Sequence, residues 1–228
     1  AWQKIEKFLE EFPKVLKEFE NLLNRNRIFM DRTINCGPIS AEAALNYGFT
    51  GPNLRAAGVD YDVRVMNPYS SYEDFDFIIP VGTNGDTYDR YMVRHVEMQQ
   101  SMSIIRQAIQ KLQSLKDQTS FHADVPEFYL PPKDEVYNTM EGLIWHFKIV
   151  MGEVDIPKGE VYHCVEGGNG ELGFYLISDG GRTPYRLHFR RPCFIYYQAY
   201  ADMIRGSMLS DAILTMSSMN VIAGELDA

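Results

Sequence analysis

Two long stretches of the chain repeat their apolar residues with the period of an α-helix. The first runs from Trp2 to about Arg25, and Pro13 is expected to kink or divide it. The second runs from Thr87 to about Lys116, which gives about 45 Å at 1.5 Å per residue and is typical of a bundle or of a strut between subunits. The charged residues near its start are expected to lie on a solvated face with i,i+4 ion pairs. They are Asp86, Asp89, Arg90, Arg94, His95 and Glu97.

Shorter helical patterns occupy much of the remaining chain. Ser40 is a candidate N-cap for a helix from Ala41 to Tyr47, which Gly48 would end. Residues 61–80 are rich in Tyr, Pro, Asp and Asn, and only short extended runs such as Asp74 to Ile79 are expected there. Further helices are predicted over Asp134 to Met151, Phe194 to Ile204 and Leu209 to Met219.

The period of the pattern changes between Gly159 and Arg190. Three strands joined by glycine turns are predicted there, as a small antiparallel meander: Val161 to Val165, Leu172 to Ser178 and Tyr185 to Phe189. The predicted fold class is therefore α+β and mostly helical, with one three-stranded sheet. The proline-containing segment Thr119 to Lys133 is expected to be a linker. It would separate a helical part, residues 1–118, from residues 119–228 of the same domain.

The stretch from Tyr47 to Asp62 combines three glycines and a proline with no regular hydrophobic period. Gly51 permits a positive φ or a close backbone approach, and Pro52 restricts φ, so a defined turn is expected. If Arg55 is held in such a turn, its guanidinium would point in one defined direction. Composition alone favours the simpler alternative, a helix C-cap followed by an ordinary loop with Arg55 in solvent.

Charge and composition exclude several classes of protein. The chain has 228 residues and a net charge of −9, which argues against non-specific binding to nucleic acid or to an anionic membrane. No apolar run approaches the roughly 20 residues of a membrane span, so we expect no direct span. Three widely spaced cysteines fit a reducing compartment and are expected to be small buried apolar residues. Because the chain starts at Ala1 within a helical pattern, we expect an excised or processed piece.

Most of the candidate chemistry in the sequence is weakly supported. A Cys–His nucleophile, a zinc site built from His163, Cys164, His188 and Cys193, and a phosphate-binding glycine loop all lack the spacing that these sites need. No metal site is therefore expected. The C-terminal run from Asn220 to Asp227 places Glu225 and Asp227 after an apolar helix end. If these carboxylates are held near a buried cavity, they could accept and release protons. The alternative is a frayed acidic tail.

Long runs of this sequence resemble the D-subunit family of respiratory complex I, which is similar in turn to the large subunits of nickel–iron hydrogenases. The runs are RTINCGPISAEAALNYGFTGPNLRAAGVDYDVR (Arg32 to Arg64), NPYSSYEDFDFIIPVGTNGDTYDRYMVRHVEMQQS (Asn67 to Ser101), PKGEVYHCVEGGNGELGFYLISDGGRTPYR (Pro157 to Arg186) and VIAGELDA at the end. The resemblance covers nearly all of the chain.

The resemblance implies a hydrogenase-large-subunit-like helical bundle that acts within a proton-translocating NADH:quinone oxidoreductase. Such a subunit would pack against an iron–sulfur subunit and other subunits of the complex, peripherally on the cytoplasmic side of the bacterial inner membrane. Its substrate would be quinone. The cluster would belong to the neighbouring subunit, and this chain would bind no cofactor. By analogy with the family's C-terminal run, Ile222, Gly224, Glu225 and Asp227 are expected to line the quinone pocket. Gly51, Pro52, Arg55 and Arg186 are expected at an interface or in a structural role.

Two departures from the family pattern limit these expectations. Ala228 stands where the family usually has arginine, and the family's N-terminal half, which holds the histidine and tyrosine thought to donate protons, has no counterpart here. This chain alone is therefore expected to be inactive. The alternatives are a membrane-bound nickel–iron hydrogenase subunit, although the terminal run contains none of the metal-binding cysteines of that class, and a non-catalytic scaffold module.

Overall fold

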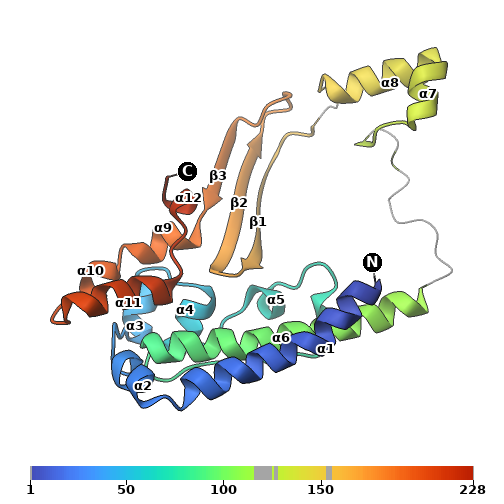
Figure 1. Ribbon diagram of the computed structural model, residues 1–228. Helices are drawn as coiled ribbons and strands as arrows, with labels where there is room; N and C mark the ends of the chain where they lie inside the picture. The colour runs from blue at the N-terminus through green and yellow to red at the C-terminus, as the bar shows by residue number, and fades with distance from the viewer. Residues whose placement is uncertain (1, 116–124, 126–127, 153–155, 228) are drawn as a thin grey trace. The chain divides into compact units, whose positions relative to one another are not determined.

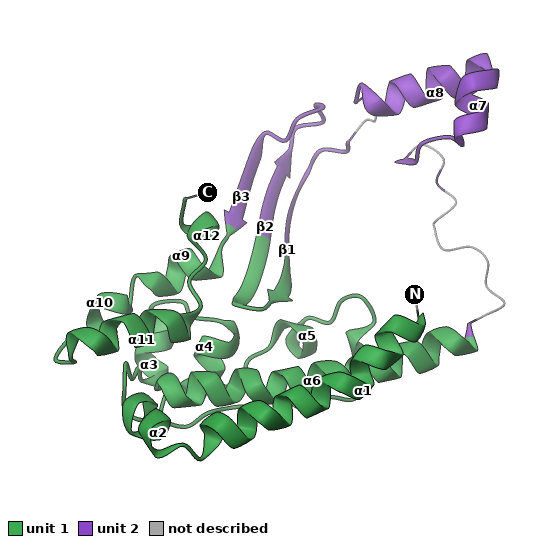
Figure 2. Ribbon diagram, in the orientation of Figure 1, with its two compact units in different colours: residues 1–114, 164–173, 190–228 green, residues 115–163, 174–189 purple. Residues whose placement is uncertain are grey.

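The computed structural model describes residues 2–115, 125, 128–152 and 156–227 (Figure 1). The described chain is mostly helical with one antiparallel sheet in the order β1-β2-β3, which confirms the predicted fold class. Two compact units are present (Figure 2): unit 1 is Ala1–Ser114, Cys164–Gly173 and Arg190–Ala228, and unit 2 is Leu115–His163 and Phe174–Phe189. The division at residues 118 and 119 stays a prediction. Most of the segment predicted as a linker, Thr119 to Lys133, lies outside the described residues.

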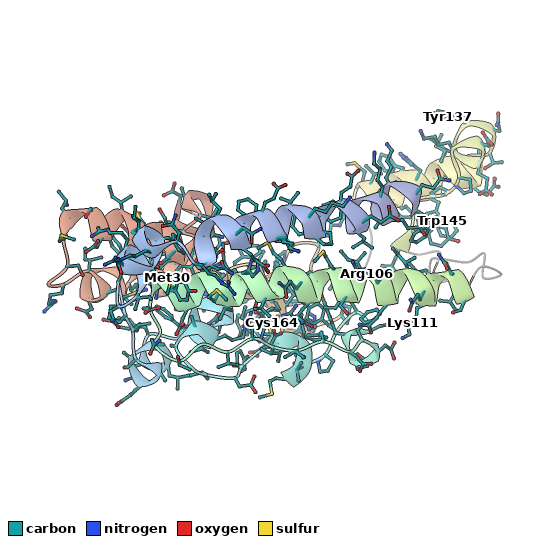
Figure 3. All side chains as sticks on the ribbon, turned by 60° about the horizontal axis from the view of Figure 1, so that its bottom comes forward. Met30, Arg106, Lys111, Tyr137, Trp145 and Cys164 are labelled. Atoms are coloured by element: carbon teal, nitrogen blue, oxygen red, sulfur yellow. The ribbon has the colours of Figure 1, made fainter. Side chains whose placement is uncertain are left out.

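In unit 1, a long helix packs lengthwise against the N-terminal helix. Helix α6 (Thr87–Ser114) and helix α1 (Trp2–Phe19) lie side by side in Figures 1 and 3. The buried residues between them are Leu9, Leu16, Met102 and Ile109.

Pro13 does not divide α1, contrary to that part of the prediction. Proline cannot donate to the carbonyl four residues earlier, that of Leu9. The guanidinium Nη2 of Arg106, from α6, donates to this carbonyl at 3.2 Å instead, and Figure 3 labels Arg106 beside the two helices. The chain leaves α-helical geometry only at the π-helical turn Glu20–Asn24, after which α2 spans Arg27–Thr33.

The main core of unit 1 is built from short helices. It contains Phe49, Leu54, Tyr196 and Met219 among its buried residues. The elements before α6 are α3 (Ala41–Asn46), α4 (Gly51–Ala56), α5 (Val63–Met66) and a 3₁₀ turn at Tyr72–Asp74. Those after the sheet are α9 (Pro192–Tyr197), α10 (Tyr200–Met203), α11 (Leu209–Met219) and α12 (Ala223–Asp227).

Several local predictions for this core are confirmed. The Ser40 hydroxyl caps α3 by accepting from the Ala43 amide at 3.2 Å, and Gly48 ends this segment with a φ of +77°. Helix α11 is confirmed with the predicted bounds. The three cysteines are free and buried.

Other local predictions are wrong. The stretch expected to be a turn contains helix α4, with Pro52 in its first turn where the missing N–H costs nothing. Residues 61–80 contain α5 and the 3₁₀ turn, which includes Asp74; the extended run begins only at Phe75, and it pairs in no sheet. The helix predicted over Phe194 to Ile204 is two short helices. For the terminal run, the alternative of a frayed acidic tail is wrong, because Ala223–Asp227 form α12.

The three predicted strands are present, as β1 (Gly159–Gly167), β2 (Gly170–Ser178) and β3 (Arg186–Arg190). The end of β1, its turn and the start of β2 belong to unit 1, whereas most of the remaining strand residues belong to unit 2. Unit 2 also contains α7 (Lys133–Asn138) and α8 (Met140–Val150). They replace the single helix predicted over Asp134 to Met151, because Thr139 is extended and its hydroxyl caps α8 at Gly142.

Candidate functional site

Arg55 lies at the centre of a buried cluster of charges in unit 1. Its side chain is 1% exposed, so the alternative of a solvated Arg55 is wrong. The Nη1 group lies 2.9 Å from Glu166 Oε1 and 3.2 Å from Asp62 Oδ2, and Nη2 pairs with Glu97. Nη1 also donates to the Tyr61 carbonyl at 3.0 Å. Three carboxylates and a carbonyl therefore hold this guanidinium in one orientation.

Two of the three carboxylates around Arg55, those of Glu166 and Asp62, respond differently to burial. Burial raises the pKa of Glu166, and the nearby positive charge of Arg55 offsets this only in part. Burial also acts to raise the pKa of Asp62, but hydrogen bonds from Arg64 and the charges of Arg55 and Arg64 outweigh it, so the pKa falls. The pKa of Asp62 is therefore lowered and that of Glu166 raised, although both carboxylates lie beside the same guanidinium.

Gly51 makes a close backbone contact with the β1–β2 hairpin. Its φ is +66°, and a Cβ there would lie 2.3 Å from Gly170 Cα. Beside this contact the Thr50 hydroxyl accepts from the Glu171 amide at 3.0 Å, and Arg190 donates to the Gly48 carbonyl at 3.0 Å. Gly51 and Pro52 therefore lie where helix α4 meets the hairpin, and Pro52 is itself buried.

The C-terminal candidates lie on α12 and just before it. Glu225 turns inward, where Oε2 accepts from the Cys193 amide at 2.9 Å. Ile222, Gly224 and Asp227 are exposed. An open groove of about 460 Å³ runs beside this helix and is lined by Met216, Ser217, Asn220, Val221, Ala223 and Leu226.

The candidates predicted from the sequence do not form one site. Gly51, Pro52 and Arg55 share α4, whereas Gly224, Glu225 and Asp227 share α12, which Ile222 precedes. Arg186 is exposed at the start of β3 and belongs to unit 2. Within the described ranges no group of three His, Cys, Asp or Glu side chains is placed to hold a metal ion. Across the same ranges, no helix has both the length and the apolar character of a membrane span.

The sequence did not predict the buried polar residues at the start of α6. Asp86 and Arg90 are each 1% exposed and His95 is 3% exposed, so the solvated face expected for these residues is wrong. Arg90 donates to the carbonyls of Gly85 and Gly37 at 2.8 and 2.9 Å. The i,i+4 spacing of Arg90 and Arg94 places both on one face, but the spacing cannot show what covers that face.

The chain matches a known protein family over its whole length. The model of the family described as "Respiratory-chain NADH dehydrogenase, 49 Kd subunit" matches residues 1–228. The chain is 73% identical over 228 residues to the D-type subunit numbered 2 of the NADH-quinone oxidoreductase of Cytophaga hutchinsonii, covering 100% of this chain and 58% of the relative. It is 70% identical over 228 residues to the D-type subunit of the same enzyme of Flavobacterium johnsoniae, covering 100% of this chain and 55% of the relative.

A relative with lower sequence identity belongs to the same kind of subunit. The chain is 55% identical over 223 residues to the D-type subunit of the NADH-quinone oxidoreductase of Leptospira biflexa, covering 98% of this chain and 54% of the relative. The chain thus spans between 54% and 58% of the length of these three relatives. Because the family model matches the whole chain, the chain belongs to the 49 kDa subunit family of the respiratory-chain NADH dehydrogenase.

Proposed function

We propose that this chain is part of a D-type subunit of a proton-translocating NADH–quinone oxidoreductase and forms one wall of its quinone pocket. Family membership supports the activity, since the relatives are named as D-type subunits of NADH-quinone oxidoreductases. The observation that carries the pocket assignment is the arrangement of the run from Ile222 to Asp227. One carboxylate, that of Glu225, binds the core, while Ile222, Gly224 and Asp227 are exposed.

In this proposal the four candidates have different roles. Glu225 holds α12 against the Cys193 amide and so orients the helix. Ile222 and Gly224 offer an apolar surface that suits a quinone ring, and Asp227 offers a carboxylate that can bind a polar group of the substrate or hold a proton near it. The electrons would arrive from NADH through an iron–sulfur cluster in a neighbouring subunit. The residues of this chain would bind and orient the quinone.

The same proposal includes the partners and the location of the protein. The chain would contact the iron–sulfur subunit and would lie peripherally on the cytoplasmic side of the bacterial inner membrane. Arg55, Gly51 and Pro52 would contribute by holding α4 in shape, since Arg55 and Pro52 are buried and Gly51 contacts the hairpin. The exposed Arg186 is the candidate for a direct contact with another subunit.

Conservative substitutions in the C-terminal run test the pocket in the intact complex. Ile222→Met lengthens the apolar side chain, and Asp227→Asn removes the negative charge. Each is expected to raise the KM for quinone about threefold to tenfold and to change sensitivity to quinone-site inhibitors, since about 1.4 kcal/mol of binding energy is tenfold in affinity. Electron transfer from NADH to a water-soluble artificial acceptor should stay unchanged, because that assay does not use the quinone pocket.

Matched substitutions on α2 are the controls. Ile28 is 75% exposed and the Asp31 side chain 68% exposed, so Ile28→Met and Asp31→Asn make the same chemical changes on another surface. They are expected to leave the KM for quinone unchanged. If both C-terminal variants kept normal quinone reduction and inhibitor sensitivity, the pocket assignment would be wrong.

A further inference from the structure

The C-terminal end of α11 is held by side chains from two other helices of unit 1. The helix ends at Met219, and Asn220 follows in the left-handed conformation with a φ of +57°. The Met219 carbonyl accepts from Asn53 Nδ2 of α4 at 3.2 Å and lies 3.5 Å from Arg94 Nη2 of α6. Arg94 Nη2 also donates to Asn53 Oδ1 at 3.1 Å, so the two side chains bind the carbonyl as a connected pair.

A second arginine of α6 contacts the same end of α11. Arg90 Nε donates to the Ser218 hydroxyl at 2.9 Å. Helix α11 has no basic residue in its own last turn. Because the C-terminus of a helix carries a partial negative charge and unpaired carbonyls, cations are stabilising there. Helix α6 therefore supplies the positive charges that the sequence of α11 lacks.

Burial lowers the pKa of both arginines, and Arg90, with a pKa of about 10, stays charged at neutral pH. The charge of Arg94 contributes further to the lower pKa of Arg90. Arg90 donates four hydrogen bonds to described residues, and their acceptors are the carbonyls of Gly85 and Gly37 and the hydroxyls of Thr87 and Ser218 rather than carboxylates. Arg90 is buried and Arg94 is half-buried, so placing both charges at this helix end has a free-energy cost that their hydrogen bonds offset.

The turn after Met219 leads directly to α12. Asn220 Nδ2 donates to Asn169 Oδ1 at 2.5 Å, and the Asn220 carbonyl accepts from the Tyr196 hydroxyl at 3.3 Å. Two residues later comes Ile222, and α12 is then bound through Glu225. The contacts to the Met219 carbonyl therefore fix the position at which the C-terminal run, with its exposed residues, begins.

We propose that Arg94 and Asn53 are positioning residues for quinone reduction: they hold the Met219 carbonyl and thereby orient the run from Ile222 to Asp227. Neither needs to touch the substrate. The inference rests on the proposed function, because it supposes that this run lines the quinone pocket. It adds residues of α4 and α6 that the resemblance did not assign to the site.

The test is Arg94→Gln in the intact complex. Losing the guanidinium should raise the KM for quinone about twofold to fivefold, which is less than the substitutions at Ile222 and Asp227, because coupling through a neighbouring group is usually weaker than a direct contact. The change in kcat should be smaller than the change in KM. Arg94→Lys keeps the charge and one donor and should recover part of the loss. Amide hydrogen exchange over residues 220–227 should become faster in Arg94→Gln, because the turn is released.

Arg106→Gln is the matched control. Arg106 belongs to the same helix and also donates to a backbone carbonyl, that of Leu9 in α1, at 3.2 Å. Its replacement should speed exchange around residue 9 and leave exchange over residues 220–227 and the KM for quinone unchanged. Asn53→Ser is the second variant, in case Arg94→Gln prevents assembly, because it removes the amide but keeps Arg94. It should give the same exchange and KM changes as Arg94→Gln.

The two measurements separate this inference from the proposed function. Normal exchange over residues 220–227 in both Arg94→Gln and Asn53→Ser would overturn the positioning role. Faster exchange there with an unchanged KM for quinone would support the hold on α12 and would contradict the quinone pocket itself. Faster exchange with a raised KM, and recovery by Arg94→Lys, would support both.

Discussion

Helices α4 and α12 are both short and belong to the same compact unit, but they differ completely in burial. All six residues of α4 are buried, whereas none of the five residues of α12 is. Helix α4 is fixed from all sides by the core, the hairpin and the carboxylates around Arg55. Helix α12 is fixed at its start, at Glu225 and at the partly buried Leu226, and its remaining residues are exposed. Substitutions in α4 should therefore report on the fold, whereas substitutions in α12 should report on binding.

The contacts explain why the two helices should respond differently to mutation. Arg55 in α4 is 1% exposed and pairs with Asp62, Glu97 and Glu166, so its loss leaves buried charges without a partner. In α12, Leu226 packs partly against the core and Glu225 makes one hydrogen bond to the Cys193 amide. Gly224 has no neighbouring described atom within 4 Å of the position of an added Cβ.

The largest effect is expected from Arg55→Ala. Uncompensated buried carboxylates should destabilise unit 1 by about 3–5 kcal/mol, measured as a lower denaturant midpoint of the intact protein. Arg186→Ala removes an exposed arginine and should change stability by no more than about 0.5 kcal/mol. If the two substitutions changed the free energy of unfolding equally, the contrast between α4 and the exposed surface would be wrong, because the buried contacts of Arg55 would then contribute nothing to stability.

A pair of glycine substitutions tests the difference between α4 and α12 directly. Gly51→Ala places a Cβ 2.3 Å from Gly170 Cα at a φ of +66°, and should cost about 2–5 kcal/mol through strain and overlap. Gly224→Ala is expected to be neutral or to stabilise by about 0.5–1 kcal/mol, since alanine suits a helix interior better than glycine. Thermal unfolding of the two variants measures both values. A large loss of stability in Gly224→Ala would show that α12 is more tightly packed than the structure indicates.

The smallest effect is expected at alkaline pH from Tyr61, whose carbonyl accepts from Arg55. Burial and the hydrogen bond to Glu171 raise the pKa of this phenol from 10.0 to about 12. The folded state therefore keeps a proton that the unfolded chain releases above pH 10, so stability falls as pH rises from 10 to about 12. Because the side chain is partly exposed, the loss should be about 1 kcal/mol.

Tyr61→Phe should remove this part of the alkaline loss, measured as the difference in denaturant midpoint between about pH 9 and about pH 12. Tyr137, which is 81% exposed, supplies the control, and Tyr137→Phe should leave the alkaline loss in place. An identical pH dependence in wild type and Tyr61→Phe would contradict the environment described for Tyr61.

The accuracy of the sequence predictions followed the length and regularity of each element. The period of α6, the alternation of the three strands and the cap at Ser40 are local signals, and the structure confirms them. Helix α4 was missed because six residues containing a glycine and a proline are too short to show a period. Pro13 was expected to interrupt α1, but the carbonyl it leaves free is satisfied by Arg106, 97 residues away.

Sequence alone was sufficient to predict the fold class, the long helix, the meander and the buried cysteines, and its long runs led to the family. It was not sufficient to show which polar residues are buried. Arg55 meets Glu97 and Glu166 across separations of 42 and 111 residues, and Arg94 meets the Met219 carbonyl across 125. Local patterns depend on neighbouring residues and survive in the sequence, whereas the free energy of a buried charge depends on its partners in space. Only the tertiary structure brings those partners together.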